Sequence, residues 1–248
     1  KESIDIDYLE DFKLAKCLLH FDESINPEAD DRFLRLLNKF QFEKIKHIIF
    51  DLGGVILNID YTRPLKAFEA LGLPKKDHFY SKQQQDNLFD QLETGQITEA
   101  AFVQAMQQRI PGASAADILQ AWNSILLDFP IRRLQLLQQL QLHYDLYLLS
   151  NTNEIHEKAF NLILQQTCGY PTLALFFDKV YFSHRVGLRK PDPRIFERVL
   201  QENHLQPFQT LFIDDSPQHI AAAAQLGIRT IHMQDGMTME EDIFRLKA

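Results

Sequence analysis

Short apolar runs alternate with longer amphipathic stretches through most of the second half of the chain. The short runs are typical of buried strands, and the longer stretches carry apolar residues at helical spacing. The predicted strands are 45–50, 146–149, 179–182, 210–213 and 230–232, and the predicted helices are 131–142, 153–166, 192–203 and 217–226. Strands that alternate with helices at this spacing predict parallel βαβ units. We therefore expect an α/β fold with a doubly wound parallel sheet, covered by helices on both faces.

The stretch from residue 62 to residue 128 has a different pattern. Helical periodicity runs through it, for example over 99–109 and 115–127, and no β-rich run interrupts it. This pattern predicts an all-helical insert. We therefore predict a core domain made of residues 45–61 and 129–248, with a helical domain, 62–128, inserted into it.

Residues 1–44 form a polar and charged segment ahead of the first predicted strand. Two helical patterns are plausible there, Tyr8–His20 and Asp30–Phe40, and Asp30 can cap the second. No residue of this segment suggests chemistry. We interpret it as a helical extension that packs against the core or binds a partner.

The chain is acidic overall, with 26 Lys and Arg against 34 Asp and Glu and a formal net charge of −8. Nucleic acids and anionic membranes attract positive charge, so neither is predicted as a partner. No apolar run approaches the roughly 18 residues of a membrane helix, and no signal-peptide pattern is found. Cys17 and Cys168 lie far apart and outside any CxxC motif. These features predict a cytoplasmic protein without structural zinc or a disulfide framework.

Polar residues follow three of the predicted strands directly. Asp51 comes after the first strand, Ser150-Asn151-Thr152 after the second and Asp214-Asp215-Ser216 after the fourth. Lys190 lies in a loop just before a predicted helix. Ligands of parallel sheets bind at the carboxyl ends of the strands. If these strands are neighbours, the three polar clusters meet at one edge of the sheet.

Such a group of residues fits phosphoryl chemistry. Carboxylates that lie close together repel one another and favour a hard divalent cation, and an all-oxygen site with few ligands suits Mg²⁺. A lysine, hydroxyl groups and backbone N–H groups suit phosphoryl oxygens. A carboxylate at a strand end can act as a nucleophile and form an aspartyl-phosphate.

The order of these motifs resembles the haloacid dehalogenase-like hydrolase superfamily, in the subgroup with a helical cap inserted after the first motif. Four motifs carry the resemblance, and it covers roughly residues 45–248. The motifs are Phe50-Asp51-Leu52-Gly53-Gly54-Val55, Leu149-Ser150-Asn151, Arg189-Lys190-Pro191-Asp192-Pro193 and Phe212-Ile213-Asp214-Asp215-Ser216. The segment from Phe89 through Glu93-Thr94-Gly95 to Thr98 is similar to the loop between the cap helices of this subgroup. The resemblance implies a Rossmann-like core, with residues 62–128 as the cap domain.

The resemblance also implies a role for each motif residue. It implies a Mg²⁺-dependent phosphatase of a small phosphorylated metabolite, such as a sugar phosphate, that acts through an aspartyl-phosphate intermediate. Asp51 is the implied nucleophile and a Mg²⁺ ligand, together with the Gly53 carbonyl and Asp215. Asp214 either binds the metal or holds a metal-bound water. The implied phosphoryl-binding residues are Ser150, the backbone of Asn151, Gly54 and Lys190, with Lys190 neutralising the charge of the nucleophile and the phosphoryl group.

One position departs from the pattern. Phosphatases of this superfamily usually carry a second Asp two residues after the nucleophile, where it serves as general acid and base, but this chain has Gly53 there. Loss of general acid–base help costs on the order of 10²–10⁴ in rate. Three explanations stay open: another group or water supplies the proton, the reaction is that of a 2-haloacid dehalogenase, or the chain is a weakly active or non-catalytic binding member.

His184, His219 and Asp60 are the candidate replacements for the missing acid. Arg63 could reach a substrate anion or could equally be a solvated arginine. We expect His47 to pack within the first strand and Trp122 to lie in the core of the insert. Ordinary structural roles are also available for the motif residues, since Ser150 could cap the following helix and Lys190 could be a solvated surface lysine.

Overall fold

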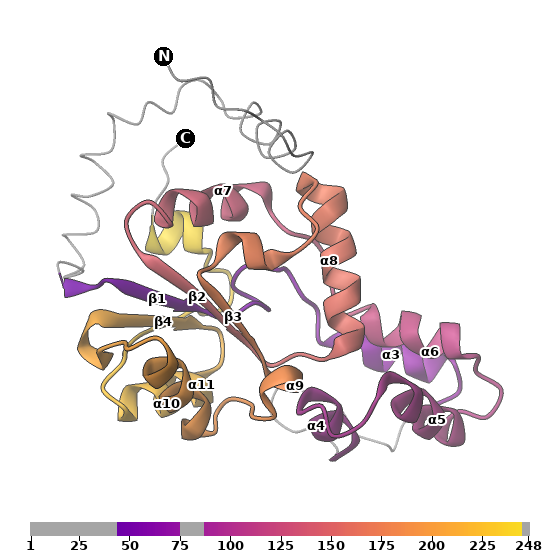
Figure 1. The fold of residues 1–248 in the computed structure, drawn as a ribbon. Helices are drawn as coiled ribbons and strands as arrows, with labels where there is room; N and C mark the ends of the chain where they lie inside the picture. Colours follow the sequence, from indigo (N-terminus) through magenta and orange to yellow (C-terminus); the bar gives the residue numbers. More distant parts are fainter. Residues whose placement is uncertain (1–43, 75–86, 245–248) are drawn as a thin grey trace, which may run out of the picture.

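The computed structural model describes residues 44–74 and 87–244 of the chain. Both helical patterns predicted in the first 44 residues lie outside the described residues. Within the described part, five parallel strands form a sheet with the order β3-β2-β1-β4-β5 (Figure 1). The strands are β1 (His47–Phe50), β2 (Asp145–Ser150), β3 (Lys179–Phe182), β4 (Thr210–Asp214) and β5 (Arg229–His232). The predicted doubly wound parallel sheet is therefore confirmed, with strand ends that differ from the prediction by at most two residues.

The central strand β1 sets the position of the site. Its last residue, Phe50, lies opposite Leu148 of β2 and Ile213 of β4. The chain winds from β1 through β2 to β3 on one side and then returns to β4 and β5 on the other. In such a sheet the crevice for ligands lies at the carboxyl ends of the strands where the winding direction changes. Here that point is at the end of β1, between β2 and β4.

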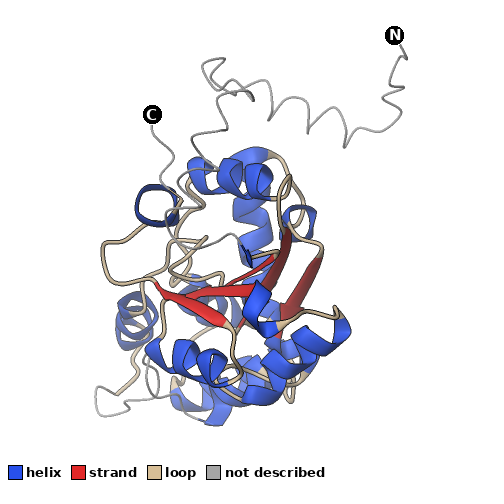
Figure 2. Ribbon diagram, turned by 90° about the vertical axis from the view of Figure 1, so that its left-hand side faces the viewer, coloured by secondary structure: helices blue, strands red, loops and turns tan. Residues whose placement is uncertain are grey.

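Helices cover both faces of the sheet (Figure 2). Successive strand residues point to opposite faces, so Phe50 packs in one apolar cluster with Leu137 and Phe160, whereas Ile49 packs in another with Val199 and Ala223. Helices α7 and α8 cover the first face, and α10 and α11 cover the second (Figure 1). The helices of the core are α7 (Ile131–Leu140), α8 (Glu154–Cys168), the short α9 (Ser183–Val186), α10 (Pro193–Glu202) and α11 (Pro217–Gln225). Short turns of helix complete it: η3 (Leu173–Phe176), η4 (Pro207–Gln209) and η5 (Met239–Ile243).

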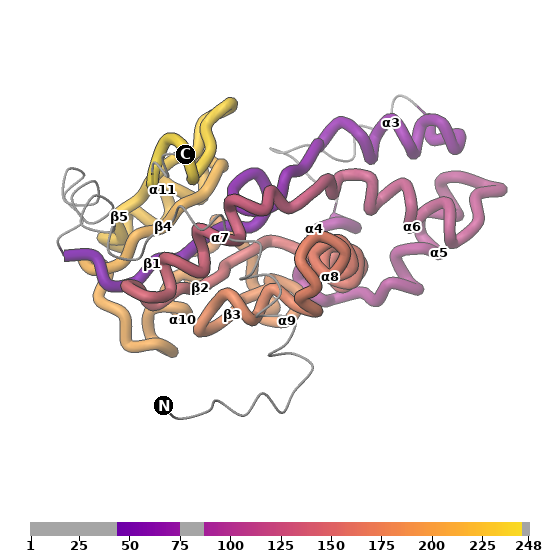
Figure 3. The backbone as a smooth tube through the Cα atoms, turned by 90° about the horizontal axis from the view of Figure 1, so that it is seen from above, coloured from indigo at the N-terminus to yellow at the C-terminus, as the bar shows by residue number. Residues whose placement is uncertain are grey.

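Between β1 and α7 the described chain contains helices and no further strand of the sheet. These helices are α3 (Thr62–Ala70), α4 (Asn87–Glu93), α5 (Glu99–Arg109) and α6 (Ala115–Asn123). They share a separate apolar cluster in which Trp122 packs against Phe89 and Phe102, with ring centroids 4.8 and 5.7 Å apart. Trp122 is fully buried there, as expected. Figure 3 shows α3, α5 and α6 at the end of the molecule opposite β5, and we call α3–α6 the helical insert.

Two linkers, residues 57–61 and 124–130, join the helical insert to the core, and their backbones form hydrogen bonds with each other. The backbone of Asn58 bonds to Asp128 and Leu127, and the Asp60 N–H donates to the Ile125 carbonyl, each at 2.9 Å. This pairing explains why α6 ends at Asn123, four residues before the predicted end, because the chain beyond it is needed for the linker ladder. No helix in the described ranges is long and apolar enough to cross a membrane.

Candidate active site

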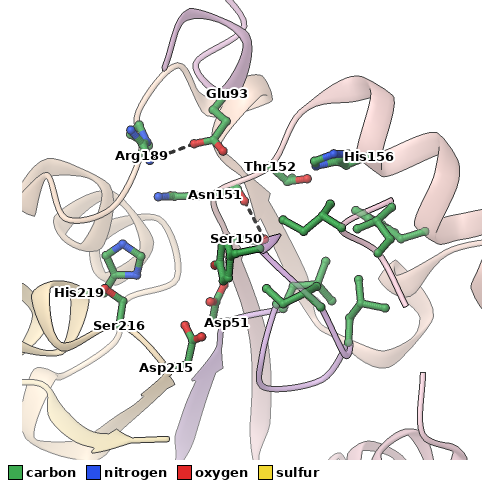
Figure 4. A pocket seen from close by; sticks show the side chains of 18 residues that line it. Asp51, Glu93, Ser150, Asn151, Thr152, His156, Arg189, Asp215, Ser216 and His219 are labelled. Atoms are coloured by element: carbon green, nitrogen blue, oxygen red, sulfur yellow. Dashed lines mark hydrogen bonds and ion pairs between the residues drawn. The ribbon is translucent and has the colours of Figure 1, made fainter. Parts of the chain in front are cut away.

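Three carboxylates meet at the carboxyl edge of the sheet. Asp51 follows β1, and Asp214 and Asp215 lie at the end of β4. Each offers an oxygen atom, and these oxygens lie within 4.8 Å of one another. Ser150 ends the neighbouring strand β2, so its hydroxyl lies beside Asp51 (Figure 4). The structure therefore brings together the strand-end residues that the sequence singled out.

Lys190 lies beneath this group and is completely buried. Its Nζ atom is 2.8 Å from Asp51 Oδ1 and 2.6 Å from Asp214 Oδ2. The Asn151 side chain fixes the lysine loop by accepting from the Lys190 N–H and donating to the Lys190 carbonyl, both at 2.9 Å. Lys190 is thus not a surface lysine. The sequence assigned a role only to the backbone of Asn151 and missed this clamp by its side chain.

Burial and charge move the pKa values of Asp51, Asp214 and Lys190. Burial raises the pKa of Asp51 to about 7, against the opposing effect of Lys190 and with help from the two neighbouring aspartates. Burial alone would also raise the pKa of Asp214, but Lys190 and His219 lower it to about 2. Burial would lower the pKa of Lys190, yet Asp214 and Asp51 raise it above its usual range. Asp51 therefore needs more positive charge nearby if it is to be fully ionised at neutral pH.

Asp214, the last residue of β4, and Asp215, which follows it, have different surroundings. Asp214 is fully buried, and its Oδ1 accepts from the Ser216 N–H at 2.7 Å and from His219 Nδ1 at 3.0 Å while its Oδ2 faces Lys190. Asp215 lines the pocket instead. Its carboxylate approaches Gly54 so closely that a Cβ there would lie 2.6 Å from Oδ2, and Gly54 has a φ of +74°. Asp215 is thus the better placed of the two to bind a cation in the pocket, and Gly54 makes room for it.

A pocket opens above these groups between the core and the helical insert (Figure 4). Asp51, Ser150 and Asp215 line its floor. The linkers and the helical insert contribute a wall that is formed by Leu57, Ile59, Tyr61, Glu93, Ile125 and Leu126. The predicted residues Gly53 and Asn151 also line the pocket, whereas Gly54, Lys190 and Asp214 are not among its lining residues.

The space beside Gly53 is filled by an apolar side chain. A Cβ at this position would lie 2.8 Å from Cδ1 of Ile59, which belongs to the first linker. The chain therefore has a methyl group where a longer residue at position 53 would project. Gly53 cannot act as the general acid, so the proton for the leaving group must come from another residue of the pocket or from water.

Of the three replacements considered for the missing acid, only His219 lines the pocket. Its Nδ1 is anchored on Asp214, and burial lowers its pKa. His184 instead has both ring nitrogens engaged, Nδ1 with the Thr152 carbonyl and Nε2 with Glu157. Asp60 accepts hydrogen bonds from the N–H and the hydroxyl of Thr62, which lower its pKa. Neither His184 nor Asp60 lines the pocket.

Arg63 and His47 do not line the pocket. Arg63 is exposed and lies 3.5 Å from Asp60, so it is a surface arginine. His47 lies in β1 as expected, and its ring pairs with Asp145 at the far end of the sheet. Ser150 does not cap the following helix, because the side chain of Asn153 does so by accepting from the His156 N–H.

Sequence reasoning missed four polar lining residues: Tyr61, Glu93, Arg189 and His156. His156 is buried in α8, where burial lowers its pKa to about 4. Its ring stacks on Trp122 and its Nε2 lies 3.2 Å from the Trp122 carbonyl. No local signal marks His156, because its position in α8 fits the helical pattern of a packed helix. Glu93 and Arg189 fall inside quoted motifs, but only the folded chain brings them together.

Comparison with known proteins gives the family. The haloacid dehalogenase-like hydrolase family matches residues 45–227, which is more than half of the chain. The chain belongs to this family. D-ribitol-5-phosphate phosphatase from Bacteroides thetaiotaomicron is 31% identical over 207 residues, which cover 80% of this chain and 97% of the relative. The family resemblance predicted from the four motifs is therefore confirmed.

Solved structures of the haloacid dehalogenase-like hydrolase family agree with this assignment. The family enzyme BT-2542 from Bacteroides thetaiotaomicron, in complex with magnesium and inorganic phosphate, matches with a TM-score of 0.71 and 36% identity. The match covers 78% of this chain and 96% of that structure. L-2-haloacid dehalogenase from Xanthobacter autotrophicus has a TM-score of 0.51 at 19% identity, covering 76% of this chain and 77% of that structure. That second likeness shows the shared fold alone.

Proposed function

We propose that the chain is a Mg²⁺-dependent phosphatase that hydrolyses a small phosphomonoester through an aspartyl-phosphate on Asp51. A sugar or polyol phosphate is the proposed substrate class. The observation that carries the proposal is the buried cluster in which Asp51 lies between Lys190 and Asp215 and faces the pocket. The phosphatase relative that matches over most of its length, and the phosphate-bound family enzyme, support the same reaction class.

The residues at the sheet edge fit a divalent cation. Three carboxylates lie within reach of one ion, and burial holds the pKa of Asp51 near 7, so a second positive charge beside Lys190 would favour its ionised form. We propose that Asp51, Asp215 and the Gly53 carbonyl hold Mg²⁺, while Asp214 keeps Lys190 in place. When bound, Mg²⁺ would neutralise the charge on the phosphoryl oxygens.

The chain's own residues then carry the reaction. The Asp51 carboxylate attacks phosphorus, the ester P–O bond breaks, and the alcohol leaves with a proton. The phosphoryl group that is transferred is stabilised by Ser150, the backbone of Asn151, the backbone near Gly54 and the charge of Lys190. Water next attacks the phosphorus of the aspartyl-phosphate, which releases inorganic phosphate and restores Asp51. A water molecule supplies the proton that the usual second Asp would give, because the neutral ring of His219 donates its N–H to Asp214.

We further propose that residues 62–128 act as a cap that closes over the pocket and excludes water, as lids of enzymes do. The pocket position between the helical insert and the core supports this role. A cytoplasmic location, and the absence of nucleic-acid and membrane partners, stay predictions from composition.

The first test is phosphate release from a panel of phosphomonoesters in Mg²⁺ and in EDTA, with halide release from 2-haloacids measured in parallel. The proposal expects phosphate release that depends on Mg²⁺, with the fastest turnover among sugar and polyol phosphates. Halide release that EDTA does not reduce would favour a dehalogenase. Absence of both activities would favour a binding role.

A further inference from the structure

Glu93 is the one charged side chain that the linkers and the helical insert bring to the pocket, as far as the chain is described. It is the last residue of α4, and its side chain is only 7% exposed. Figure 4 shows it on the opposite side of the pocket from Asp51, with Ser150 and Asn151 between them. A substrate whose phosphoryl group sits at Asp51 would therefore direct its alcohol part toward Glu93.

Arg189 holds this carboxylate in position. Arg189 Nη2 lies 3.0 Å from Glu93 Oε2, and Arg189 Nη1 pairs with Asp90, one turn earlier in α4. Arg189 is also the residue before Lys190, so the loop that carries the buried lysine also orients α4. This arrangement fixes a carboxylate of the helical insert relative to the nucleophile. Arg189 and Glu93 thus form an ion pair that joins the core to the helical insert.

The chemistry of Glu93 restricts what can bind beside it. An ionised carboxylate only accepts hydrogen bonds, so the substrate must offer a donor. Ile59 and Ile125 of the same wall offer no polar side-chain atom. A second anionic group on the substrate would be repelled, and an alkyl chain would leave a buried carboxylate poorly solvated. Hydroxyl groups satisfy both requirements.

We propose that Glu93 is a specificity-determining residue that accepts hydrogen bonds from hydroxyl groups of the alcohol part of the substrate. Phosphate esters of polyhydroxylated alcohols are then preferred over esters of plain alkyl alcohols. This inference rests on the proposed phosphatase function and assigns its substrate preference to one side chain.

The test compares a pentitol phosphate, pentyl phosphate and aminopentyl phosphate in the full-length protein with Mg²⁺. Hydrogen bonds to charged groups are the strong ones, so the ratio of kcat/KM for the pentitol ester to that for the pentyl ester should be at least about 10. Glu93→Gln should reduce this ratio about tenfold, and Glu93→Asp, which keeps the charge, should reduce it less. Because the ratio is taken within one variant, a change in the amount of folded protein cancels.

Glu99→Gln is the matched control. Glu99 lies on α5 of the same helical insert and pairs with Lys158 of the core at 3.1 Å, but it does not line the pocket. Its substitution should leave the ratio unchanged. A ratio that stays constant in Glu93→Gln, or that falls equally in Glu99→Gln, would overturn the inference. A preference for the aminopentyl ester over the pentitol ester would overturn it in favour of an ammonium group. If none of the three esters is hydrolysed, the proposed phosphatase function itself is wrong.

Discussion

The pocket has two sides, the core wall contributed by the core and the insert wall contributed by the linkers and the helical insert. The two walls differ in the chemistry of their side chains. The core wall carries charged and hydroxyl groups at the ends of β1, β2 and β4, and its buried lysine is bonded to two carboxylates. The insert wall is mostly apolar, and Glu93 is its charged side chain among the described residues. Rigid strand ends hold groups more accurately than loops do. In the proposed function, the core carries the chemistry, whereas the helical insert selects the substrate.

The largest expected effect comes from the core wall. Asp51→Asn removes the proposed nucleophile but keeps the shape of the side chain, and phosphate release should fall by at least about 10⁴-fold. Asp60→Asn is the control, because Asp60 is near the helical insert but does not line the pocket. Its turnover should stay within about twofold of the unmodified protein. Substantial turnover in Asp51→Asn would show that the core wall does not hold the nucleophile.

A pair of lysines tests how strongly the core wall depends on its buried cation. Lys190→Met leaves Asp51 and Asp214 buried without their partner, and the free energy of unfolding should fall by about 3–5 kcal/mol. Lys158 also bridges two carboxylates, Glu99 and Glu154, but its side chain is 59% exposed. Urea denaturation of Lys158→Met should show a much smaller loss, because exposed ion pairs contribute little to stability. Equal losses in the two variants would contradict the account.

The contact between the core and the helical insert should make stability depend on pH, because His156 of the core stacks on Trp122 of the helical insert and is buried there. Its pKa is about 4 in the folded protein, against 6.5 for an ordinary histidine. Between these values the unfolded chain binds a proton that the folded protein does not. Acidification from pH 6.5 to 4 should therefore cost about 3 kcal/mol of stability through this residue.

His156→Gln should lose correspondingly less stability over that pH range, because glutamine does not titrate. Urea denaturation at several pH values measures the difference, with His143→Gln, an exposed position after α7, as the control. Parallel stability–pH curves for the unmodified protein and His156→Gln would mean that the ring is not buried as the structure has it.

Two glycines of the helical insert give the smallest effect. Gly95 has a φ of +68°, and a Cβ there would lie 2.2 Å from the backbone carbonyl oxygen of His184 in the core. Gly112 has a φ of +99° but open space around it. Alanine at a positive φ costs about 1–2 kcal/mol at either site. Gly95→Ala should cost roughly 1 kcal/mol more than Gly112→Ala in thermal denaturation and should raise KM, because the helical insert is displaced from the core. Equal behaviour would show that this contact does not hold the two walls together.

The same contrast explains what could be predicted from the sequence. Strand ends were predictable because apolar runs stop abruptly at Asp51, Ser150 and Asp214, and parallel strands bring such ends to one edge. Family motifs then supplied their roles. The ion pair of Glu93 with Arg189 was not predictable, because the two residues lie about a hundred positions apart in the sequence and meet only when the helical insert packs on the core. Local periodicity carries no information about such a contact.

Two details of the core also escaped prediction. The side chain of Asn151 clamps the backbone of Lys190, and the side chain of Ile59 fills the space beside Gly53. Both depend on how loops fold back over the sheet edge. The sequence marked Gly53 as a departure from the family pattern, but it gave no means of finding what lies in its place.

The most direct test of the account is whether Asp51 becomes phosphorylated. The protein would be mixed with a phosphomonoester that it hydrolyses, labelled on phosphorus, in the presence of Mg²⁺. The reaction would be stopped in acid within milliseconds to seconds, and the peptides analysed for label. The account predicts transient label on the peptide that contains Asp51 and none in Asp51→Asn. Phosphate release at full rate with no labelled peptide at any time, or label on another residue, would contradict it.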